Sequence, residues 1–598
     1  MANVGGKWPT KKSSGSAQSL EFGSPHVFRR IRLVVNVAGA SIGWQGTSVV
    51  EDHMEDAAHK KGPEIVLGLV GAVGTDLELV SRFLSEALAD LSYRCVPIQL
   101  SKLMHDLPLS PWKDLTDSSE YDRYDKHMTA GNQFREFLER GDALGLLAVG
   151  AIREARQERG GGPDQPLPRH AYILRSLKHP SEVKALRNIY GPSFFLAAAY
   201  CPREVRKRNL SQKLANSEYS LQPDQFYAKA ETLMKRDESE RDANEFGQNV
   251  RDTFPLADVF IDANDPDDTR ASVKRFVELI FGTEIHTPSK DEYGMFHAQA
   301  AALRSAALGR QVGATITTVD GDIVAVGTNE VPKAGGGLYW SDDEPDKRDF
   351  RLGCEVSDKM KRRVLGDLIG RLKKQEWLAD DKQDCTVEEL VNQAFSDNPT
   401  AVMKGSQLVN SIEYFRAVHA EMAAIVDAAR RGVAIRDGVL FTTTFPCHDC
   451  AKHIVAAGIQ RVVFVEPYPK SLAPALYLDS IAVDQRRPES VQGGAAAVGY
   501  VNFESFVGIA PRQYMSLFVM GERKTKTGDV VVVNKGEAEP RFSKDLPPEL
   551  LVLVKENQEF KRFDDQMRAK IALVSAPQKN PQPAVVQTKK KEEVRGGA

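Results

Sequence analysis

The chain has 598 residues, of which 42% are hydrophobic and 27% charged, and its formal net charge at neutral pH is −3. This length exceeds what a single hydrophobic core supports, so we expect two or more domains. A net charge so close to zero creates no long-range field for a polyanion, so the composition gives no support to binding of DNA or RNA.

The first 60 residues are rich in glycine, serine and charged residues, which predicts a disordered segment. Within them, RRIRLVVNVAGAS (29–41) has basic, apolar and small residues in the order of a secretory signal. Its apolar part is short and follows 28 mostly polar residues, so we expect no signal peptide. The chain has no run of 18 or more apolar residues, so we also predict no membrane span.

An α/β pattern begins near residue 64. EIVLGLV (64–70) is typical of a buried strand, and DLELVSRFLSEALADL (76–91) has the apolar spacing of a helix. Four further strands are predicted, separated by polar, helix-like segments: 143–149, 170–177, 193–200 and 257–262. Strands that alternate with helices predict a parallel sheet over roughly 64–282, which we assign to a first domain at 61–285.

The segment GLVGAVGTD (68–76) joins the first strand to the first helix, the context of a phosphate-binding loop. Its candidate phosphate-binding residues are Gly68, Gly71, Gly74 and Thr75. A P-loop carries Lys and then Ser or Thr after its last glycine, whereas this chain has Thr75 and Asp76, so phosphoryl transfer is not expected. Nucleotide binding without turnover and a purely structural remnant both stay open.

Two later segments supply cations to this first domain, YILRSLKHPSEVKALRNIYG (172–191) and CPREVRKRNL (201–210). These cations either line a phosphate pocket or belong to solvated helix faces. We hypothesise a regulatory domain that senses a nucleotide or another regulator.

A second unit begins near residue 288. DEYGMFHAQAAALRSAALG predicts a helix that ends near Gly309, and 312–329 predicts two strands around an Asp320-Gly321 turn. The polar stretch 333–415, with helix-like pieces such as 357–378, is interpreted as an insertion. We assign 288–540 to this second domain and 541–598 to a C-terminal extension, of which 576–598 has the composition of a disordered tail.

The chain has six cysteines, and four of them are isolated, which argues against a disulfide framework and predicts a reducing, cytoplasmic location. The other two, Cys447 and Cys450, stand in FPCHDCAKHI, where a strand gives way to a helix. Such a pair is a redox couple, half of a structural zinc site or part of a catalytic one. The isolated cysteines provide no second pair for a structural site.

Upstream, His419 and Glu421 open an amphipathic helix in RAVHAEMAAIVDAARRG (416–432). His419, Cys447 and Cys450 make three zinc ligands and leave a fourth position for water, as in a catalytic site. The two cysteines share one face of a helix's first turn, where the helix dipole favours thiolates. Glu421 is then placed to carry a proton from the activated water to a ring nitrogen and on to the leaving amine.

This combination is the H-x-E…P-C-x-x-C signature of zinc nucleobase deaminases. The spacing alone is also compatible with a solvated helix start and two buried thiols.

Three segments resemble the deoxycytidylate deaminase branch of the cytidine-deaminase fold: HAE (419–421), FPCHDCAKHIVAAGIQRVVFVEPYPKS (445–471) and ALRSAALGRQVGATITTVDGDIVAVGTNEVP (302–332). The resemblance covers about 288–332 and 415–520. It implies a three-layer α/β/α fold around a mixed five-stranded sheet, and hydrolysis of cytosine to uracil with release of ammonia. It also implies Zn²⁺ as cofactor, held by His419, Cys447 and Cys450, with Glu421 as the proton carrier.

By the same resemblance, Asn329 corresponds to an asparagine that contacts the sugar, although it is also a plain turn residue in GTNEVP. Arg304, Arg310, Tyr468 and Lys470 lie in or beside the matching segments, as candidates for phosphate binding or as ordinary surface residues. The insertion at 333–415 replaces the family's usual short link, so substrate contacts there do not transfer directly.

A P-loop nucleotide-kinase-like domain followed by such a deaminase resembles the two-domain deoxycytidine-nucleotide deaminases of bacterial anti-phage defence. That resemblance implies conversion of dCTP to dUTP, and of dCMP to dUMP, to deplete the phage's precursors. We expect deoxycytidine nucleotides as substrates, a possible regulator on the N-terminal domain and a homo-oligomer.

Three alternatives stay open. A housekeeping kinase–deaminase of pyrimidine supply is weakened by the missing P-loop lysine. A polynucleotide cytosine deaminase would need a basic channel with stacking aromatic residues, which the near-neutral charge does not favour. In the third, the zinc is structural and the protein is a binding module, a reading that an intact Glu421 disfavours.

Overall fold

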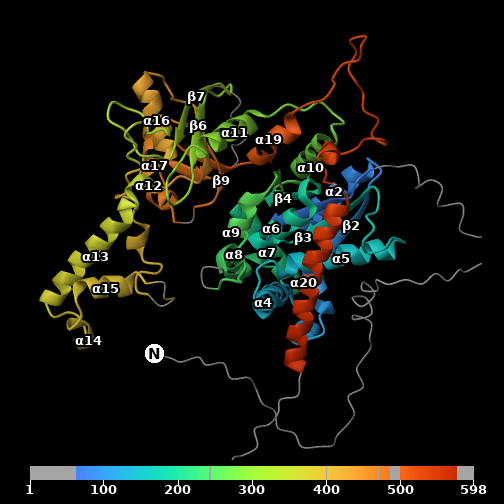
Figure 1. Ribbon diagram of the computed structural model, residues 1–598, viewed down its shortest axis with the longest axis horizontal. Helices are drawn as coiled ribbons and strands as arrows, with labels where there is room; N and C mark the ends of the chain where they lie inside the picture. The colour runs from blue at the N-terminus through green and yellow to red at the C-terminus, as the bar shows by residue number, and fades with distance from the viewer. Residues whose placement is uncertain are drawn as a thin grey trace, which may run out of the picture.

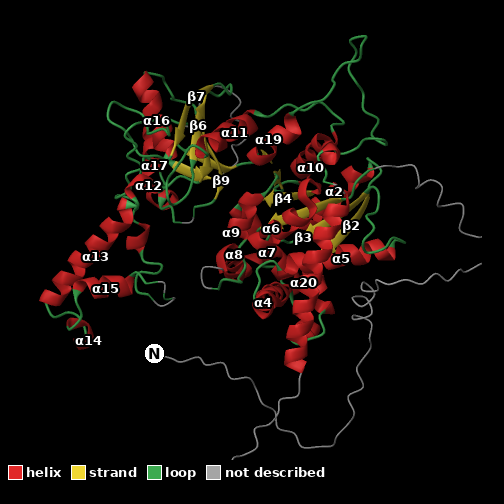
Figure 2. Cartoon of the chain, in the orientation of Figure 1, coloured by secondary structure: helices red, strands yellow, loops and turns green. Residues whose placement is uncertain are grey.

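The computed structural model describes residues 62–575, apart from 117, 241–243, 397, 399–400, 469, 485–498 and 548. The predicted disordered segments, 1–60 and 576–598, lie outside the described residues, as does the signal-like stretch at 29–41. Two six-stranded sheets with helices on both faces organise the described part (Figures 1 and 2). No helix in this part combines the length and apolar character needed to cross a membrane.

The first sheet is parallel except at one edge, in the order β12-β5-β4-β1-β3-β2. Every residue of its central strand β1 is buried, as expected for a parallel strand covered on both faces. Its strands are β1 (Ile65–Gly71), β2 (Arg94–Gln99), β3 (His170–Arg175), β4 (Phe194–Tyr200), β5 (Val259–Asp262) and the antiparallel β12 (Gly508–Ile509). The predicted parallel sheet is confirmed.

Helices cover the two faces of this sheet as two separate apolar clusters. One face carries α2 (Leu77–Ala89) and α10 (Pro266–Phe281), which pack against each other. The other carries α4 (Glu120–Leu138), α5 (Ala143–Glu158), α6 (Pro180–Tyr190) and α20 (Glu549–Ser575). Near the carboxyl ends of the strands lie α7 (Arg203–Ser217), α8 (Tyr227–Ser239) and α9 (Val250–Thr253).

The strand predicted at 143–149 is wrong, because these residues form the first half of α5. A seven-residue apolar run fits a buried strand and a helix buried on most sides equally well, and α5 packs against α4, α6 and α20. The sequence reading also missed β2. That strand is at the sheet edge, where Pro97 is tolerated because no outer strand needs its N–H.

The second sheet has the order β10-β11-β9-β8-β6-β7. Its strands are β6 (Gly313–Thr317), β7 (Ile323–Thr328), β8 (Val439–Thr444), β9 (Arg461–Glu466), β10 (Ile481–Val483) and β11 (Val501–Ser505). The predicted hairpin at 312–329 is confirmed as antiparallel β6 and β7, and the other four strands are parallel. The expected five-stranded sheet is a six-stranded one.

Helix α11 (Lys290–Ala302) packs on one face of the second sheet, while α16 (Ala420–Arg431) and α17 (His448–Ala456) cover the other. Two glycines make these contacts close. A Cβ on Gly313 would lie 2.0 Å from the carbonyl oxygen of Ala298 in α11. A Cβ on Gly327 would lie 2.1 Å from the carbonyl oxygen of Ala420 in α16. Gly327 therefore fixes the start of α16 against β7.

The helix expected to reach Gly309 ends at Ala302. Beyond it, Ser305 donates a hydrogen bond to the Asn329 carbonyl, and the Ala306 N–H donates to the buried Glu330 carboxylate at 2.9 Å. Residues 305 and 306 therefore form hydrogen bonds with the segment after β7 and do not continue the hydrogen bonds of helix α11.

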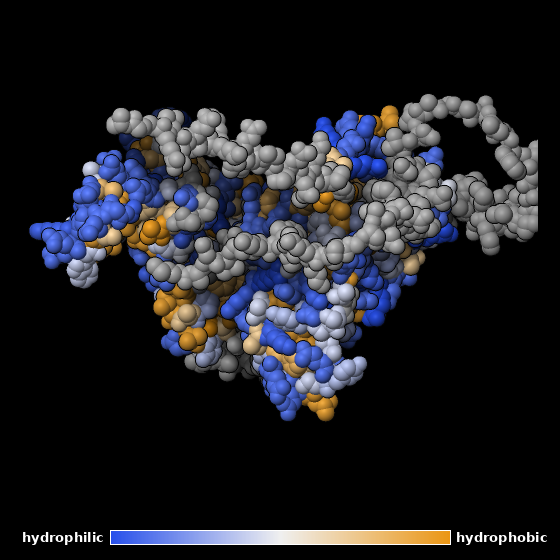
Figure 3. Space-filling view, turned by 90° about the horizontal axis from the view of Figure 1, so that it is seen from below, coloured by the Kyte–Doolittle hydropathy of each residue, from blue (hydrophilic) through white to orange (hydrophobic). Residues whose placement is uncertain are grey.

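The described residues of the predicted insertion form four helices. They are α12 (Asp349–Leu352), α13 (Val356–Lys374), α14 (Asp380–Gln383) and α15 (Val387–Ala394). Helices α13 and α15 and the segment after them form a small apolar cluster, which includes Leu365, Val391 and Met403. Figure 1 shows α13, α14 and α15 projecting at its lower left. The projecting surface of the insertion is hydrophilic in Figure 3.

After β11 the chain returns to the first unit. Strand β12 joins the first sheet, α19 (Pro511–Phe518) contacts both α10 and α11, and α20 lies along α5 and α6. Asp258, fully buried at the start of β5, pairs with Arg187 of α6 at 2.8 Å and with Arg512 of α19 at 3.2 Å. Residues 508–575, which the sequence assigned to the second domain and its extension, therefore pack in large part on the first unit.

Helix α20 is held to the first unit by a buried ionic cluster. Glu556 is fully buried and contacts Arg153 at 3.0 Å and Arg156 at 2.7 Å, both on α5. Arg156 also pairs with Glu64 at 2.7 Å. Charges this deeply buried are tolerated only when paired, so the cluster makes α20 a required part of the first unit.

The change Glu556→Ala leaves two buried guanidinium groups without their shared carboxylate. We expect it to lower the free energy of unfolding by about 3–5 kcal/mol, as for other broken buried pairs. The matched change Glu559→Ala removes a partner of exposed Arg562 on the same helix and should cost about 0–1 kcal/mol. Denaturant unfolding of the full chain compares the two, and equal costs would contradict this role of Glu556.

Candidate metal centre and catalytic cavity

Three side chains that could ligate a metal meet between the starts of two helices. His419 is the N-cap residue of α16, Cys447 is the N-cap residue of α17, and Cys450 lies in the first turn of α17. His419 Nδ1 lies 3.2 Å from the Cys447 Sγ and 3.5 Å from the Cys450 Sγ. Within the described ranges this is the one group of three or more such residues whose ligand atoms lie close together, all within 4.8 Å.

The fold brings these residues to one edge of the second sheet. Only Phe445 and Pro446 separate Cys447 from the end of β8, and α17 begins at the next residue. His419 is placed from the other side by Val418, whose N–H donates to the Glu330 carbonyl at 3.0 Å, just after β7. The close approach at Gly327 then holds the first turn of α16 against the sheet.

The donor set fits zinc. One imidazole nitrogen and two thiolate sulfurs are ligands that Zn²⁺ prefers, and three protein ligands leave a position for water or substrate. Hydrogen bonds with Cys450 and with His419 lower the pKa of the Cys447 thiol, which favours the ligating thiolate.

Glu421 lies in the first turn of α16, two residues after His419, and its side chain is 4% exposed. Burial raises the pKa of its carboxyl to about 6, and the nearby Cys447 acts in the same direction. A carboxyl group with a pKa near neutral both accepts and releases a proton readily.

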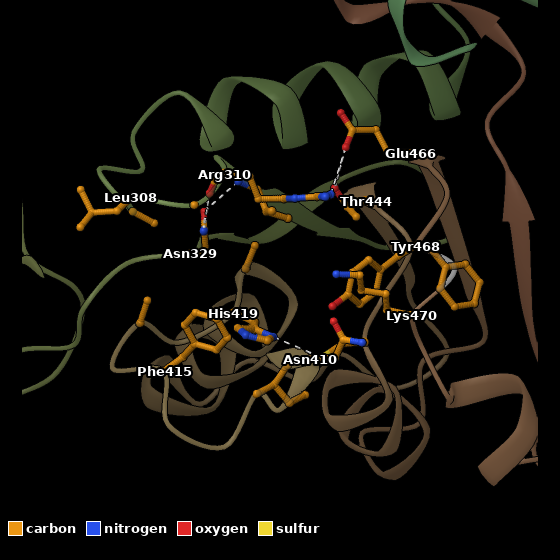
Figure 4. Close-up of a pocket in the computed structure, with 18 of the residues that line it drawn as sticks. Leu308, Arg310, Asn329, Asn410, Phe415, His419, Thr444, Glu466, Tyr468 and Lys470 are labelled. Carbon is orange, nitrogen blue, oxygen red and sulfur yellow. Dashed lines mark hydrogen bonds and ion pairs between the residues drawn. The ribbon is translucent and has the colours of Figure 1, made fainter. Parts of the chain in front are cut away.

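These groups lie at a cavity of about 1380 Å³ that three parts of the chain enclose. The second unit provides its floor, with His419, Glu421 and Cys447. The first unit contributes Ser239, Arg251, Asp252, Pro255 and Leu256. The insertion and the segment after it contribute Asp349, Glu355, Lys361, Lys404, Gly405, Val409, Asn410, Ser411, Ile412 and Phe415. Figure 4 shows Arg310, Asn329, Phe415, Tyr468 and Lys470 gathered around His419.

Four of the five predicted substrate-binding residues line this cavity: Asn329, Arg310, Tyr468 and Lys470. Arg310 pairs with Glu466 at 3.3 Å and lies 5.9 Å from the centre of the Tyr468 ring. The Asn329 side chain accepts from the Val312 N–H at 2.7 Å and donates to the Arg310 carbonyl at 2.8 Å. It therefore shapes the loop that carries Arg310, and its role towards a sugar stays a prediction.

The fifth residue, Arg304, is not among the lining residues. Its guanidinium donates to the carbonyls of Leu338 and Tyr339 at 3.3 and 3.2 Å and stacks 3.5 Å from the centre of the Trp340 ring. These contacts hold the first turn of the insertion, so the structure favours a structural role over phosphate binding.

The sequence analysis did not predict that the insertion contributes side chains to this cavity. The ring of Phe415 lies 6.0 Å from that of His419, and the ammonium group of Lys361 lies 5.1 Å from the centre of the Phe415 ring. Lys361 is only 5% exposed. Phe415 stands four residues before His419, a signal that could have found it, whereas nothing in the polar sequence around Lys361 distinguishes it from a solvated helix face.

In the first unit, Gly71, Gly74 and Thr75 lie at the turn between β1 and α2, as predicted. Gly68 does not, because it is in the middle of β1. A Cβ there would lie 2.6 Å from the Leu177 side chain, so this glycine serves packing on the sheet and the prediction of a phosphate contact at Gly68 is wrong.

Comparison with known proteins agrees with the motif. Residues 288–466 match the family model of the cytidine and deoxycytidylate deaminase zinc-binding region. The matched residues include His419, Glu421, Cys447 and Cys450, the four residues of the motif.

Among individual relatives, the deoxycytidylate deaminase of Enterobacteria phage T4 is 44% identical over 54 residues, 9% of this chain and 28% of the phage protein. ComE operon protein 2 of Bacillus subtilis is 31% identical over 96 residues, 14% of this chain and 51% of that protein. The chain thus spans about a quarter to a half of the length of these relatives.

Two solved structures were also compared. The dCMP deaminase of cyanophage S-TIM5 in complex with dCMP and dUMP is 21% identical, with a TM-score of 0.18, over 32% of this chain and 90% of that one. A gluconokinase from Sinorhizobium meliloti 1021 is 14% identical, with a TM-score of 0.19, over 38% of this chain and all of that one. At these TM-scores neither structure supports an argument about this protein.

If the three residues hold a metal, Cys450→Ser should lower the zinc content of the purified protein from about one ion per chain towards zero, because one of three protein ligands is lost. Cys354→Ser changes a cysteine outside the cluster and serves as the control, with zinc content unchanged. Elemental analysis measures both. Full zinc retention in Cys450→Ser would show that this residue is not a ligand.

Proposed function

We propose that the protein is a zinc-dependent hydrolase that deaminates deoxycytidine nucleotides, converting dCMP to dUMP and dCTP to dUTP. The observation that carries this proposal is the convergence of His419, Cys447 and Cys450 beside the buried Glu421, at the floor of a cavity lined by both cations and carboxylates. The match of this region to the deaminase zinc-binding model supports the same reaction class.

In this proposal His419, Cys447 and Cys450 would hold the zinc, which would supply an activated water by lowering the pKa of that water to about 7. Glu421 moves the protons. Its carboxylate takes one from the attacking water and gives it to N3 of the base, and a second transfer protonates the amino group. The C4–N bond then breaks, ammonia leaves, and the new C4–O bond becomes the carbonyl of uracil.

The surroundings of Glu421 suit this task. Burial excludes bulk water, so the proton passes between the carboxyl group and the base and is not lost to solvent. The ring of Phe415, which lies edge-on to the His419 ring, provides an apolar wall next to the metal ligands. A planar base fits such a wall.

The phosphates of the substrate would lie towards the cations of the cavity. Arg310 is already paired with Glu466, and Lys470 is exposed. Lys361 is different, because it is buried and its nearest carboxylate, that of exposed Asp358, lies 3.7 Å away. A buried ammonium with so weak a partner gains most from an incoming anion, so we assign Lys361 to the phosphate end of the nucleotide.

The cavity favours a free nucleotide over a polynucleotide, since the first unit and the insertion both contribute to its wall. The predicted role in anti-phage defence, by depletion of the dCTP pool, rests on the resemblance of the two-unit architecture. We retain it as part of the proposal, together with a regulator on the N-terminal unit, a cytoplasmic location and a homo-oligomeric state.

The reaction is tested by incubating the purified protein with dCMP, dCTP, CTP and single-stranded DNA and measuring uracil products. Glu421→Gln should reduce turnover of the deoxycytidine nucleotides by at least about 10²-fold, as expected for loss of a proton carrier, while the zinc content stays unchanged. Asp427→Asn, on the solvent side of the same helix and paired with Arg430, should leave turnover unchanged. Turnover that survives Glu421→Gln would contradict the mechanism.

The role of Lys361 predicts a separation of kinetic constants. Lys361→Met should raise the KM for dCMP by about 10- to 100-fold, the usual range for a lost charge-assisted hydrogen bond, with little change in kcat. Deoxycytidine, which has no phosphate, should be turned over equally by both forms. Lys359→Met changes an exposed lysine on the same helix and is the control. An equal loss with deoxycytidine would show that Lys361 does not act through phosphate.

A further inference from the structure

The loop between β1 and α2 has the geometry of an anion site but contains an anion of its own. The chain turns there with Gly74 in the left-handed region, at a φ of +92°. The N–H of Val73 does not point to solvent. It donates to the Asp237 carboxylate of α8, a residue 164 positions away in the chain, at 2.7 Å.

A lysine completes this arrangement. Lys178, which follows β3 on the neighbouring strand, lies 2.9 Å from one oxygen of Asp237 and 3.1 Å from the other. The same ammonium group donates to the Gly71 carbonyl, the last residue of β1, at 2.9 Å. The sequence lacks the lysine that a P-loop carries after its last glycine, and Lys178 brings a cation to the loop from the adjacent strand.

The Asp237 carboxylate thus occupies the position of a bound phosphate. It accepts from a backbone N–H of a glycine-containing loop at the start of a helix and pairs with a lysine, the two types of contact that hold phosphate at such loops. Asp237 is fully buried. A buried carboxylate is stable there because both contacts compensate its desolvation.

Helix α7 closes the loop from a second side. A Cβ on Gly74 would lie 2.6 Å from the Arg206 carbonyl oxygen, and the Arg206 guanidinium donates to the Val73 carbonyl at 3.4 Å. The N-terminus of α2 is capped by Asp76, which accepts from the N–H groups of Glu78 and Leu79. The backbone N–H groups of Val73, Thr75, Glu78 and Leu79 therefore already have acceptors within the chain.

We infer that this loop is an anion site filled by the chain itself, in which the Asp237 carboxylate excludes free phosphate and locks α8 over the loop. The ligand that the site takes once Asp237 is removed is a phosphate or pyrophosphate group. This inference does not depend on the deaminase reaction.

The lock has a consequence for the cavity of the second unit. Asp237 lies two residues before the end of α8, and the last residue of that helix, Ser239, lines the cavity. An anion that displaced Asp237 would therefore release the segment that contributes Ser239 to the cavity wall. A nucleotide regulator acting at this loop has to break the Asp237–Lys178 pair first.

The test is hydrogen exchange of the peptide that spans Gly71–Asp76 in the zinc-loaded full chain, in chloride or in inorganic pyrophosphate at equal ionic strength. The exchange is local, so pyrophosphate bound in the deaminase cavity does not obscure it. In the wild type we expect slow exchange in both buffers. In Asp237→Ala we expect fast exchange in chloride and protection in pyrophosphate that saturates as its concentration is raised.

Two further variants keep the test decisive. Asp237→Asn retains a hydrogen-bond acceptor for Val73 but loses the charge, and it should show the same pyrophosphate dependence if Asp237→Ala does not fold. Adding Lys178→Met to either variant should remove that dependence. Saturable protection of the wild-type loop by pyrophosphate would show that the site is open, and no protection in either Asp237 variant would show an ordinary structural ion pair. Either result overturns the inference.

Discussion

The close contact between α16 and strand β7 is the constraint on which the candidate active site depends. Gly327 lets the first turn of α16 approach the strand so closely that any side chain there would collide with the Ala420 carbonyl. His419 precedes that turn, and Glu421 lies within it. Because α17 starts directly after β8, the same sheet edge presents Cys447 and Cys450 to His419. The cluster of three candidate metal ligands follows from this packing.

The rest of the chain encloses that centre. The insertion brings Phe415 and buried Lys361 over the metal ligands, and the first unit closes the cavity with the segment around Ser239 and Arg251. The two units meet at α19, which contacts both α10 and α11, and Asp258 pairs with Arg187 of α6 and with Arg512 of α19. In the account proposed above, the Asp237–Lys178 pair holds α8, whose last residue, Ser239, lines the cavity.

Much of the centre is predictable from the sequence, because its four residues stand in two short motifs whose spacing reflects local helix geometry. The parallel first sheet and the β6–β7 hairpin are also predictable from the sequence. The periodicity of apolar residues and the identity of turn residues are signals carried by neighbouring residues. Tertiary effects explain the failures. Residues 143–149 form a helix that is buried on most sides. The Ala306 N–H after α11 donates to the Glu330 carboxylate and does not continue the helix. The Arg304 guanidinium stacks on Trp340 and does not line the cavity. The contacts of Lys361 with Phe415 and of Asp237 with Val73 and Lys178 join residues that are distant in the sequence, so no local pattern indicates them.

The central claim is that the three-ligand centre and Glu421 catalyse hydrolysis of a cytosine base in a free nucleotide. The most direct measurement follows ammonia and uracil nucleotide together during incubation of the zinc-loaded protein with dCMP and with dCTP. The account predicts equal amounts of the two products, formed in proportion to the zinc content of the sample. A protein that contains one zinc ion per chain and releases neither ammonia nor uracil nucleotide from either substrate would contradict it.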